Sequence, residues 1–476
     1  MPQEPQSPSL VRSLSLTDSI LVLAGGIIGS GIFLTAKDIA QNVRHPALFI
    51  LIWIAGLLIS MLACFALAEL GAMFPHAGGQ YVYLREAYGE FAAFLYGWMI
   101  FTVSVTGTIA ALGAGFAQYL GTAFPSLAAG QPLIHLGNWA LLRGHIVSIA
   151  SILVLTSFNI FGVRCGAILQ NIATWTKFAA IGAFVILGVA IGHGSWGHYT
   201  ASTSPEPGAN SLISGIGVAL IAVFWAYDGW VYITWVAGEV KDPQRNIPRA
   251  LVLGISLVGA IYIAINAVYL YALPMAGIAS ETTVAQAAAV VLFSASAARW
   301  LSLTIAISCF GAMAVAILTG ARVYYAMAAD GVFFKALARV HPRWRTPAIS
   351  LALQAAWSSL LALSGRYDQL FTYVMLMMVL SYFLTVVAVF VLRRKMPQRE
   401  RPYKCAGYPW GPALYLVLAG IWGINAVVQR PRETLAGVGI VLFGIPFYLY
   451  WRGRKARQFS LNPESSNHKG HELTLG

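Results

Sequence analysis

Two glycine-containing interruptions of apolar stretches hold the residues of this sequence that are best suited to bind a polar solute. One is GGIIGSGIF at residues 25–33, and the other is FWAYDGW at residues 224–230. A glycine in a helix interior costs about 1 kcal/mol relative to alanine, so the four glycines within residues 25–31 favour local unwinding. Unwinding frees main-chain N–H and C=O groups, which can then bind a ligand.

The first interruption could bind both ends of a zwitterion. If a helix resumes after it, the amides of Ser30 and Gly31 open that second half-helix, and the positive end of a helix suits a carboxylate. Carbonyl groups at the end of the first half-helix, around Ile27, would suit an ammonium group. Close packing is the alternative, because Gly25 and Gly29 form a small-xxx-small pattern. The second interruption favours the binding interpretation.

The second interruption carries Asp228, a carboxylate within an apolar stretch. If the stretch spans a membrane, a charge there costs about 2.5–3.5 kcal/mol on insertion scales, which favours a functional role. Two roles stay open: the side chain contacts the solute, or it caps the helix that follows. The neighbouring Trp225, Tyr227 and Trp230 are candidate gates, and simple packing of the aromatic rings is the alternative.

Lys177 is the third candidate. It lies near the middle of the apolar stretch Ala167–Ile191, roughly 15 Å from either end if that stretch is helical. A lysine side chain does not easily reach a membrane surface over that distance, so its ammonium group needs carbonyl or carboxylate partners inside. Two interpretations remain: Lys177 is a fixed cation that holds the first interruption, or it titrates in proton coupling.

The amino-acid composition indicates which class of protein holds these residues. Of the 476 residues, 58% are apolar and 10% are charged, whereas soluble globular proteins carry about 25% charged residues. This excludes an ordinary cytosolic enzyme, a secreted disulfide scaffold and a disordered chain. The nine histidines fall in loops, at span ends or in the tail, and the four cysteines form no metal-binding pattern. We therefore expect neither an enzyme nor a cofactor or metal site.

The apolar stretches predict an all-α polytopic membrane fold with twelve transmembrane helices, since a span needs about 20 residues. The first is interpreted as an uncleaved helix rather than a signal peptide. A short helix at Thr283–Ala298 is expected on the outer surface. The predicted spans are Leu16–Ala40, Pro46–Met73, Phe91–Tyr119, His145–Phe161, Ala167–Ile191, Leu212–Val240, Ile247–Tyr271, Trp300–Ala329, Ile349–Leu363, Gln369–Leu392, Gly411–Val428 and Thr434–Trp451.

The basic residues predict the orientation. With a cytoplasmic N-terminus, 22 of the 30 lysines and arginines fall in inner segments, Arg322 among them, and seven fall in outer loops. This bias places both termini in the cytoplasm. It also explains the net charge of +13 through contact with anionic membrane lipids rather than nucleic acid. Glu69 and Glu239, near the inner ends of two spans, are expected to form ion pairs on that side.

The two interruptions lie in the first and sixth spans, five spans apart. Because five is odd, a five-helix repeat would re-enter the membrane upside down. Matching breaks in two halves indicate a transporter with inverted repeats and a site at the midplane. The predicted division is 1–15 for a cytoplasmic N-terminal segment, 16–191 for the first repeat, 192–211 for an extracellular loop, 212–392 for the second repeat, 393–410 for a basic cytoplasmic loop, 411–451 for helices 11 and 12, and 452–476 for a cytoplasmic tail, which is expected to be disordered after Arg457.

Six motifs, in order along the chain, resemble the L-type amino acid transporters of the amino acid–polyamine–organocation superfamily. The resemblance implies a LeuT-like five-plus-five inverted repeat with discontinuous helices 1 and 6. The motifs are GGIIGSGIF (25–33), ALAELGAMFPHAGGQYVYLREAYG (66–89), FWAYDGW (224–230), EVKDPQRNIPRAL (239–251), ARVYYAMAADG (321–331) and RPYKCAGYP (401–409).

The same resemblance implies the site. Lys177 matches a family lysine that takes roughly the place of sodium in sodium-coupled relatives, which fits sodium-independent exchange by alternating access. Proton-coupled relatives also carry such a lysine, so a proton-coupled amino acid or polyamine symporter is the alternative. The implied substrate ligands are the amides of Gly29, Ser30 and Gly31 for the carboxylate, and the carbonyls of Ile27, Trp225 and Asp228 for the amino group.

Two departures from the family pattern affect substrate and partners. Many members that carry large neutral amino acids have glycine where this chain has Asp228, and an acidic group there resembles members that accept cationic or small polar amino acids. Animal members carry a cysteine between spans 3 and 4 that bonds a glycoprotein, and residues 120–144 contain none. We therefore expect a stand-alone bacterial transporter in the inner membrane, without a disulfide-linked heavy subunit.

Overall fold

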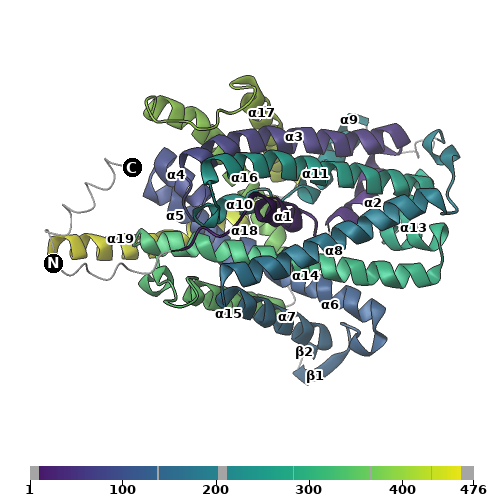
Figure 1. Ribbon diagram of the computed structural model, residues 1–476, viewed down its shortest axis with the longest axis horizontal. Coiled ribbons are helices and arrows are strands. Elements are labelled where there is room, and N and C mark those ends of the chain that lie inside the picture. The colour runs from purple at the N-terminus through teal and green to yellow at the C-terminus, as the bar shows by residue number, and fades with distance from the viewer. Residues whose placement is uncertain are drawn as a thin grey trace.

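The computed structural model describes residues 10–29, 31–136, 139–201, 212–281, 283–364, 367–429 and 431–461. Most of these residues are helical, and the long helices run along the long axis of the molecule (Figure 1). Within these ranges, eight helices are long and apolar enough to cross a membrane. They are Pro46–Met73, Glu90–Ala123, Arg143–Ile160, Val163–Ala190, Pro243–Ala272, Ala295–Ala329, Met377–Lys395 and Thr434–Lys455.

The elements follow one another as short and long helices, with one hairpin. A π-helical turn, Ile100–Ser104, joins α5 to α6, and 3-10 turns occur at Pro125–Leu127, Trp196–Tyr199, Ala237–Glu239 and Lys335–Ala338. The helices and strands are α1 (Leu16–Ile27), α2 (Gly31–Val43), α3 (Pro46–Met73), α4 (Gln80–Tyr88), α5 (Glu90–Met99), α6 (Val105–Ala123), β1 (Pro132–Leu136), β2 (Trp139–Leu142), α7 (Arg143–Ile160), α8 (Val163–Ala190), α9 (Leu212–Ala226), α10 (Tyr232–Trp235), α11 (Pro243–Ala272), α12 (Met275–Ser280), α13 (Val284–Leu292), α14 (Ala295–Ala329), α15 (Ala348–Ser364), α16 (Tyr367–Lys395), α17 (Trp410–Gln429), α18 (Pro431–Leu442) and α19 (Gly444–Leu461).

Local sequence explains where the site-bearing helices begin. α1 starts at a capping box, in which the Asp18 amide donates to Ser15 Oγ at 3.2 Å and the Ser15 amide donates to Asp18 Oδ2 at 2.9 Å. α3 and α11 each begin with a proline, Pro46 and Pro243. Proline is favoured there because its fixed φ suits a helix and its missing N–H would have no partner in the first turn.

Three parts of the span prediction need correction. The sixth span is not one interrupted helix up to Val240, because only the four-residue α10 and a 3-10 turn follow α9. The twelfth lies within the membrane-spanning run Thr434–Lys455, but this run has a turn at Phe443, between α18 and α19. Pro446 explains the turn, since it lacks the N–H that a continuous helix would need. α19 also continues to Leu461, beyond the predicted start of a disordered tail.

The short helix α12 was not predicted, nor were the β1–β2 hairpin and α4. β1 and β2 pair antiparallel within the expected loop after the third span, so the all-α class is almost but not fully correct. α4 lies between the second and third spans. All three are too short to cross a membrane, so the search for runs of about 20 apolar residues could not find them. The predicted helix Thr283–Ala298 is α13, and α14 begins within its last residues.

α1 lies in the middle of the bundle, where the broken helices meet (Figure 1). It packs against α8, α10, α11 and α14. α2 packs mainly against α9. The first half of each broken helix thus contacts the second half of the other: α1 contacts α10, and α9 contacts α2. The long helices α8, α11 and α14 surround the place where they cross.

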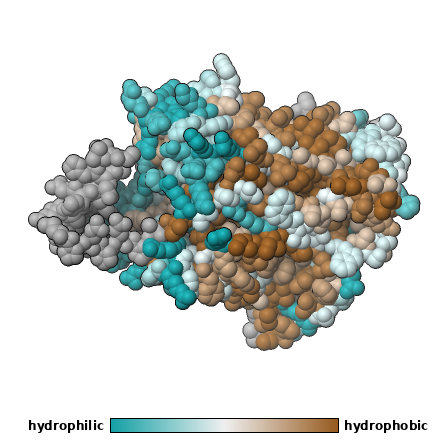
Figure 2. Space-filling view, viewed as in Figure 1, coloured by the Kyte–Doolittle hydropathy of each residue, from teal (hydrophilic) through white to brown (hydrophobic). Residues whose placement is uncertain are grey.

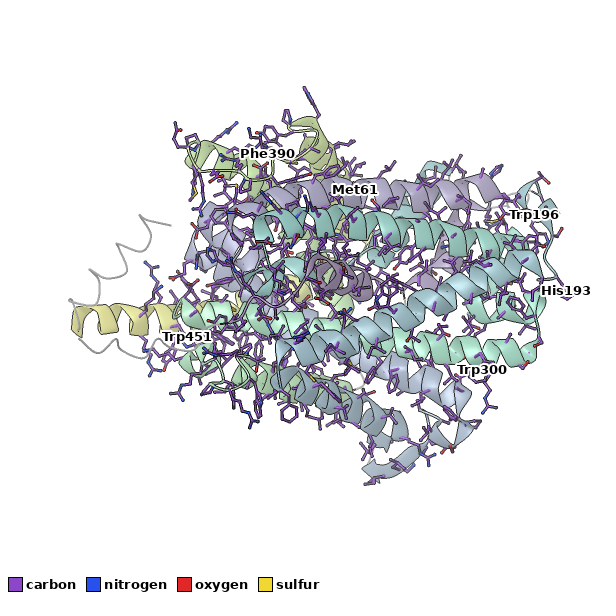
Figure 3. All side chains as sticks on the ribbon, viewed as in Figure 1. Met61, His193, Trp196, Trp300, Phe390 and Trp451 are labelled. Atoms are coloured by element: carbon purple, nitrogen blue, oxygen red, sulfur yellow. The ribbon has the colours of Figure 1, made fainter. Side chains whose placement is uncertain are left out.

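The surface agrees with a membrane protein. Figure 2 shows an apolar surface over most of the molecule, and hydrophilic residues gathered at the end where α4, α5 and α19 lie. Figure 3 shows Trp196, His193 and Trp300 toward the other end of the molecule. These tryptophans are 62% and 72% exposed, and exposed tryptophan is enriched where a membrane meets water.

The two glutamates that were expected in ion pairs do form them. Glu239 pairs with Arg322 (Oε1 to Nε, 2.9 Å), and both side chains are fully buried. Glu69 accepts from Arg393 at 2.6 and 2.9 Å and lies 3.3 Å from Arg401 Nε. Arg322 is therefore not an exposed basic residue at the inner surface but an interior one, whose charge is compensated by Glu239.

Candidate functional site

The first predicted interruption is present. α1 ends at Ile27 and α2 begins at Gly31. The amide of Ile28 still donates to Ala24 as in a helix, at 2.9 Å, but the Gly29 amide turns back and donates to the Ile27 carbonyl at 2.8 Å. Ser30, one of the predicted ligands, lies outside the described residues.

The second interruption lies against the first. α9 ends at Ala226, and the Asp228 amide donates to the Trp225 carbonyl at 3.1 Å in the turn that follows. Gly229 has φ of +115°, a conformation that favours glycine. A Cβ atom on Gly229 would lie 3.1 Å from the Gly26 oxygen. Glycine is therefore required here both by the turn and by the close approach of the two main chains.

Lys177 binds the first interruption. It projects from α8, is fully buried, and its Nζ donates to the carbonyls of Ile28 at 2.7 Å, Gly25 at 3.1 Å and Ser308 at 3.4 Å. The Ser308 hydroxyl of α14 lies 3.0 Å from the Ile28 oxygen and 3.2 Å from the Gly29 oxygen. An ammonium group has three donors, and here all three meet main-chain carbonyls at or beside the break.

Tyr262 links the two interruptions. Its side chain comes from α11 and is fully buried. The hydroxyl lies 3.1 Å from the carbonyl oxygen of Ile27 and 3.0 Å from that of Ala226, the last residues of α1 and α9. Carbonyl groups in the last turn of a helix have no partner within the helix, and the single hydroxyl proton of Tyr262 can be donated to either of these two.

Asp228 does not cap the following helix. The N-cap position of α10 is Val231. The Asp228 carboxylate instead accepts a hydrogen bond from the Tyr382 hydroxyl of α16 at 2.5 Å, and the side chain is only partly buried. The ring of Tyr382 packs against Trp230, with centroids 4.8 Å apart. Among the two roles that the sequence left open, the capping interpretation is therefore wrong.

The other aromatic candidates differ in their surroundings. Tyr227 is fully buried, donates its hydroxyl proton to the Trp53 carbonyl at 3.1 Å, and packs against the ring of Tyr262. This placement is that of a packed aromatic residue. Trp225 is partly exposed, and its Nε1 would lie 3.4 Å from a Cβ on Gly31. The side chain of Trp225 therefore lies next to the start of α2.

The structure thus brings together every predicted binding residue that it describes, but the Gly29 amide is engaged by Ile27 rather than open to a ligand. Three partners were missed: Tyr262, Ser308 and Tyr382. Their hydroxyl groups within apolar stretches were a signal. However, serine hydroxyls in helices often bond only to their own helix, and nothing in the local sequence marks the partners of a tyrosine hydroxyl. In the described part of the chain, no cluster of three histidine, cysteine or acidic side chains could hold a metal.

The arrangement brings together groups of the kind that can bind a small dipolar solute. Two helix ends direct carbonyl groups, with partial negative charge, toward the crossing of the broken helices. The Lys177 ammonium group contacts the first interruption, and the Asp228 carboxylate belongs to the second. Such groups can bind a solute in the middle of a bundle without forming or breaking a covalent bond.

Comparison with known proteins identifies the family. Residues 14–447 match the family model described as amino acid permease. The chain is 30% identical to the serine/threonine exchanger SteT of Bacillus subtilis, over 94% of this chain and 98% of the relative. It is also 30% identical to the human b(0,+)-type amino acid transporter 1, over 94% and 89%. Human Asc-type amino acid transporter 1 is 26% identical, over 99% and 89%. As the sequence resemblance predicted, the chain belongs to the amino acid permease family of the amino acid–polyamine–organocation superfamily and is a multi-pass membrane amino acid transporter, not an enzyme.

Proposed function

We propose that this transporter is a sodium-independent exchanger that works by alternating access. The observation that carries the proposal is the position of the Lys177 ammonium group, which binds the carbonyls of Gly25 and Ile28 at the first interruption. A cation bound there stabilises the carbonyl groups that the break leaves without helical partners, so no added metal ion is needed. Because all three of its protons have acceptors, the fixed-cation role is favoured over a titrating one.

The substrate is held by main-chain groups of both interruptions. Its carboxylate binds the amides of Gly29, Ser30 and Gly31 at the start of α2, where the helix dipole is positive. The Gly29 amide must release the Ile27 carbonyl when the carboxylate arrives. The ammonium group then binds that carbonyl. The carbonyls of Trp225 and Asp228 complete its set of acceptors.

The substrate side chain is small and polar in this proposal. Asp228 and Tyr382 form a hydrogen-bonded pair beside the second interruption, and the oxygen atoms of such a pair can accept from a hydroxyl group. The similarity to a protein named as a serine/threonine exchanger points the same way. A large apolar side chain would cover the carboxylate and add no hydrogen-bond donor to the one that Tyr382 supplies, at a cost in affinity.

The architecture behind this activity is a LeuT-like inverted repeat of residues 16–191 and 212–392, within twelve transmembrane helices. The reciprocal packing of α1 with α10 and of α2 with α9 supports it, since two broken helices of opposite direction would cross in this way. Both termini are cytoplasmic, and the protein lies in the inner membrane of a bacterium. It works without a disulfide-linked subunit, because residues 120–144 contain no cysteine.

Counterflow tests the exchange mechanism. Proteoliposomes are preloaded with unlabelled serine or threonine, and uptake of labelled serine is measured in sodium-free buffer with equal pH on both sides. We expect preloading to increase uptake, and the increase to be independent of sodium. Equal uptake by empty and preloaded vesicles would contradict exchange. If an imposed pH gradient drives uptake into empty vesicles, the alternative, a proton-coupled amino acid or polyamine symporter, is correct.

A further inference from the structure

The segment 78–80, which leads into α4, lies against the second half of the broken helix. The Gly78 amide donates to the carbonyl of Trp235, the last residue of α10, at 2.9 Å. A Cβ atom on Gly79 would lie 2.7 Å from the carbonyl carbon of Thr234 and 2.8 Å from its oxygen. Only glycine can come this close to another main chain, so the segment and α10 are fixed to each other.

Gln80 extends this contact to α16. It is the first residue of α4, and its side chain is fully buried. Its Nε2 donates to the Thr385 hydroxyl of α16 at 3.0 Å, and its Oε1 accepts from the Tyr96 hydroxyl of α5 at 2.7 Å. The Thr385 hydroxyl in turn donates to the Ser381 carbonyl of its own helix at 2.7 Å. These groups form one directed chain of hydrogen bonds from α5 through α4 to α16.

The two elements that the segment 78–80 contacts are the ones that hold the Asp228–Tyr382 pair. Asp228 lies just before α10, and Tyr382 precedes Thr385 by three residues, about one helical turn. The carboxylate and its hydroxyl donor thus come from separate elements, and their hydrogen bond requires these elements to keep one relative position. The segment contacts α10 through its main chain and α16 through the Gln80 side chain.

We propose that Gln80 is a positioning residue for the Asp228–Tyr382 pair. It holds α16 in the rotation that directs the Tyr382 hydroxyl to Asp228. That hydroxyl fixes the carboxylate in the orientation in which it accepts from a substrate hydroxyl. The inference rests on the proposed function, which assigns a small polar substrate side chain to this pair. It adds a specificity-determining residue that acts through α16.

Glutamine suits the position because a donor and an acceptor are both required there. Tyr96 supplies a proton, whereas Thr385 directs its own proton to Ser381 and can only accept from Gln80. A side-chain amide has both groups. Methionine has a similar length and neither group. Gln80→Met therefore removes the link to α16 and fills most of the same space.

The experiment compares how well serine and alanine inhibit uptake of labelled serine in proteoliposomes, since alanine lacks only the hydroxyl. We expect Gln80→Met to reduce the preference for serine over alanine about fivefold, as weakening of one oriented hydrogen bond implies. Thr385→Val breaks the same link from α16 and should give the same loss. The matched control is Gln354→Met. Gln354 is also fully buried, but its Nε2 donates to the Ile317 carbonyl of α14 at 3.1 Å, so the control should keep the wild-type preference.

A double variant separates positioning from general loosening of the fold. Tyr382→Phe should itself lower the preference for serine, and adding Gln80→Met should lower it no further, because Gln80 acts through the Tyr382 hydroxyl. A further loss in the double variant would overturn the inference. An unchanged preference in Gln80→Met would overturn it as well, and so would an equal loss of affinity for serine and alanine.

Melting temperature reports the folding of each variant. If Gln80→Met does not fold, Thr385→Val decides alone, since α16 keeps its main-chain hydrogen bonds in that variant. If serine and alanine inhibit the wild type equally, the assignment of the substrate side chain in the proposed function fails, and the inference fails with it. If the wild type prefers serine and Gln80→Met does so to the same degree, only the inference fails.

Discussion

Replacing Lys177 with methionine separates its role at the break from its role in stability. The side chain keeps its unbranched shape and loses the three donors that reach Gly25, Ile28 and Ser308. The Ile28 oxygen keeps the Ser308 hydroxyl at 3.0 Å, whereas Gly25 loses a donor that its own helix does not replace. Main-chain geometry around Ile27 should therefore change, although the fold around it stays.

The magnitude follows from these contacts. A hydrogen bond from a charged group contributes about 1.5–3 kcal/mol, and a buried carbonyl left without a donor costs about 1–3 kcal/mol. Loss of these contacts should raise the free energy of the observed main-chain conformation at the break by about 3 kcal/mol. This predicts a transport rate more than about a hundredfold lower than that of the wild type. The melting temperature should hold or rise, because a buried charge without a carboxylate partner is replaced by an apolar side chain.

The assay is serine counterflow in proteoliposomes, with melting temperature measured on the same preparation. Thr176→Val is the matched control, since Thr176 is a neighbour of Lys177 on α8 and its hydroxyl bonds only to Ile172 of its own helix, at 2.8 Å. The control should transport like the wild type. Transport by Lys177→Met within threefold of the wild-type rate would refute the reasoning, and so would a large fall in its melting temperature.

Three further predictions concern charged groups. Asp228→Asn keeps an acceptor for Tyr382 but removes the charge. Competition assays should therefore show about tenfold weaker binding of serine and tighter binding of leucine. If the affinities for both amino acids are unchanged, the Asp228 side chain does not contact the substrate. Arg322→Met leaves Glu239 charged and buried, which should cost about 3–5 kcal/mol of stability, seen as a lower melting temperature that the added change Glu239→Gln restores. His76 lies before α4, and burial, aided by Arg85, lowers its pKa. Its folded form therefore loses stability as the pH falls below about 6.5, so acidification should lower the melting temperature of the wild type more than that of His76→Gln.

Much of the site could be predicted from the sequence because its main parts lie close together along the chain. The four glycines within residues 25–31 make a continuous helix costly wherever that segment lies. Lys177 is an isolated charge in an apolar stretch. Because its side chain is too short to reach either end of that stretch easily, its ammonium group needs partners in the interior. The predicted ion pairs of Glu69 and Glu239 follow from the same argument, since neither charge is stable alone in an apolar interior.

Other parts could not be predicted because they depend on contacts between distant segments. Tyr262 reaches the carbonyl of Ile27 across 235 residues of sequence, and no local pattern distinguishes it from Tyr269 on the same helix. The role of Asp228 was open for a similar reason. Whether a carboxylate caps a helix or accepts from Tyr382 is decided by where α10 begins and by which helix packs beside it.

The sequence by itself determined that the chain is a polytopic membrane protein, where most of its apolar helices run, and where two of them break, because hydrophobicity and backbone propensity are properties of short segments. Tertiary structure alone decided which donors satisfy the freed carbonyls and how near the two breaks lie. Those contacts depend on how several helices pack together, and the free energy of a buried polar group depends on the partners that packing brings to it.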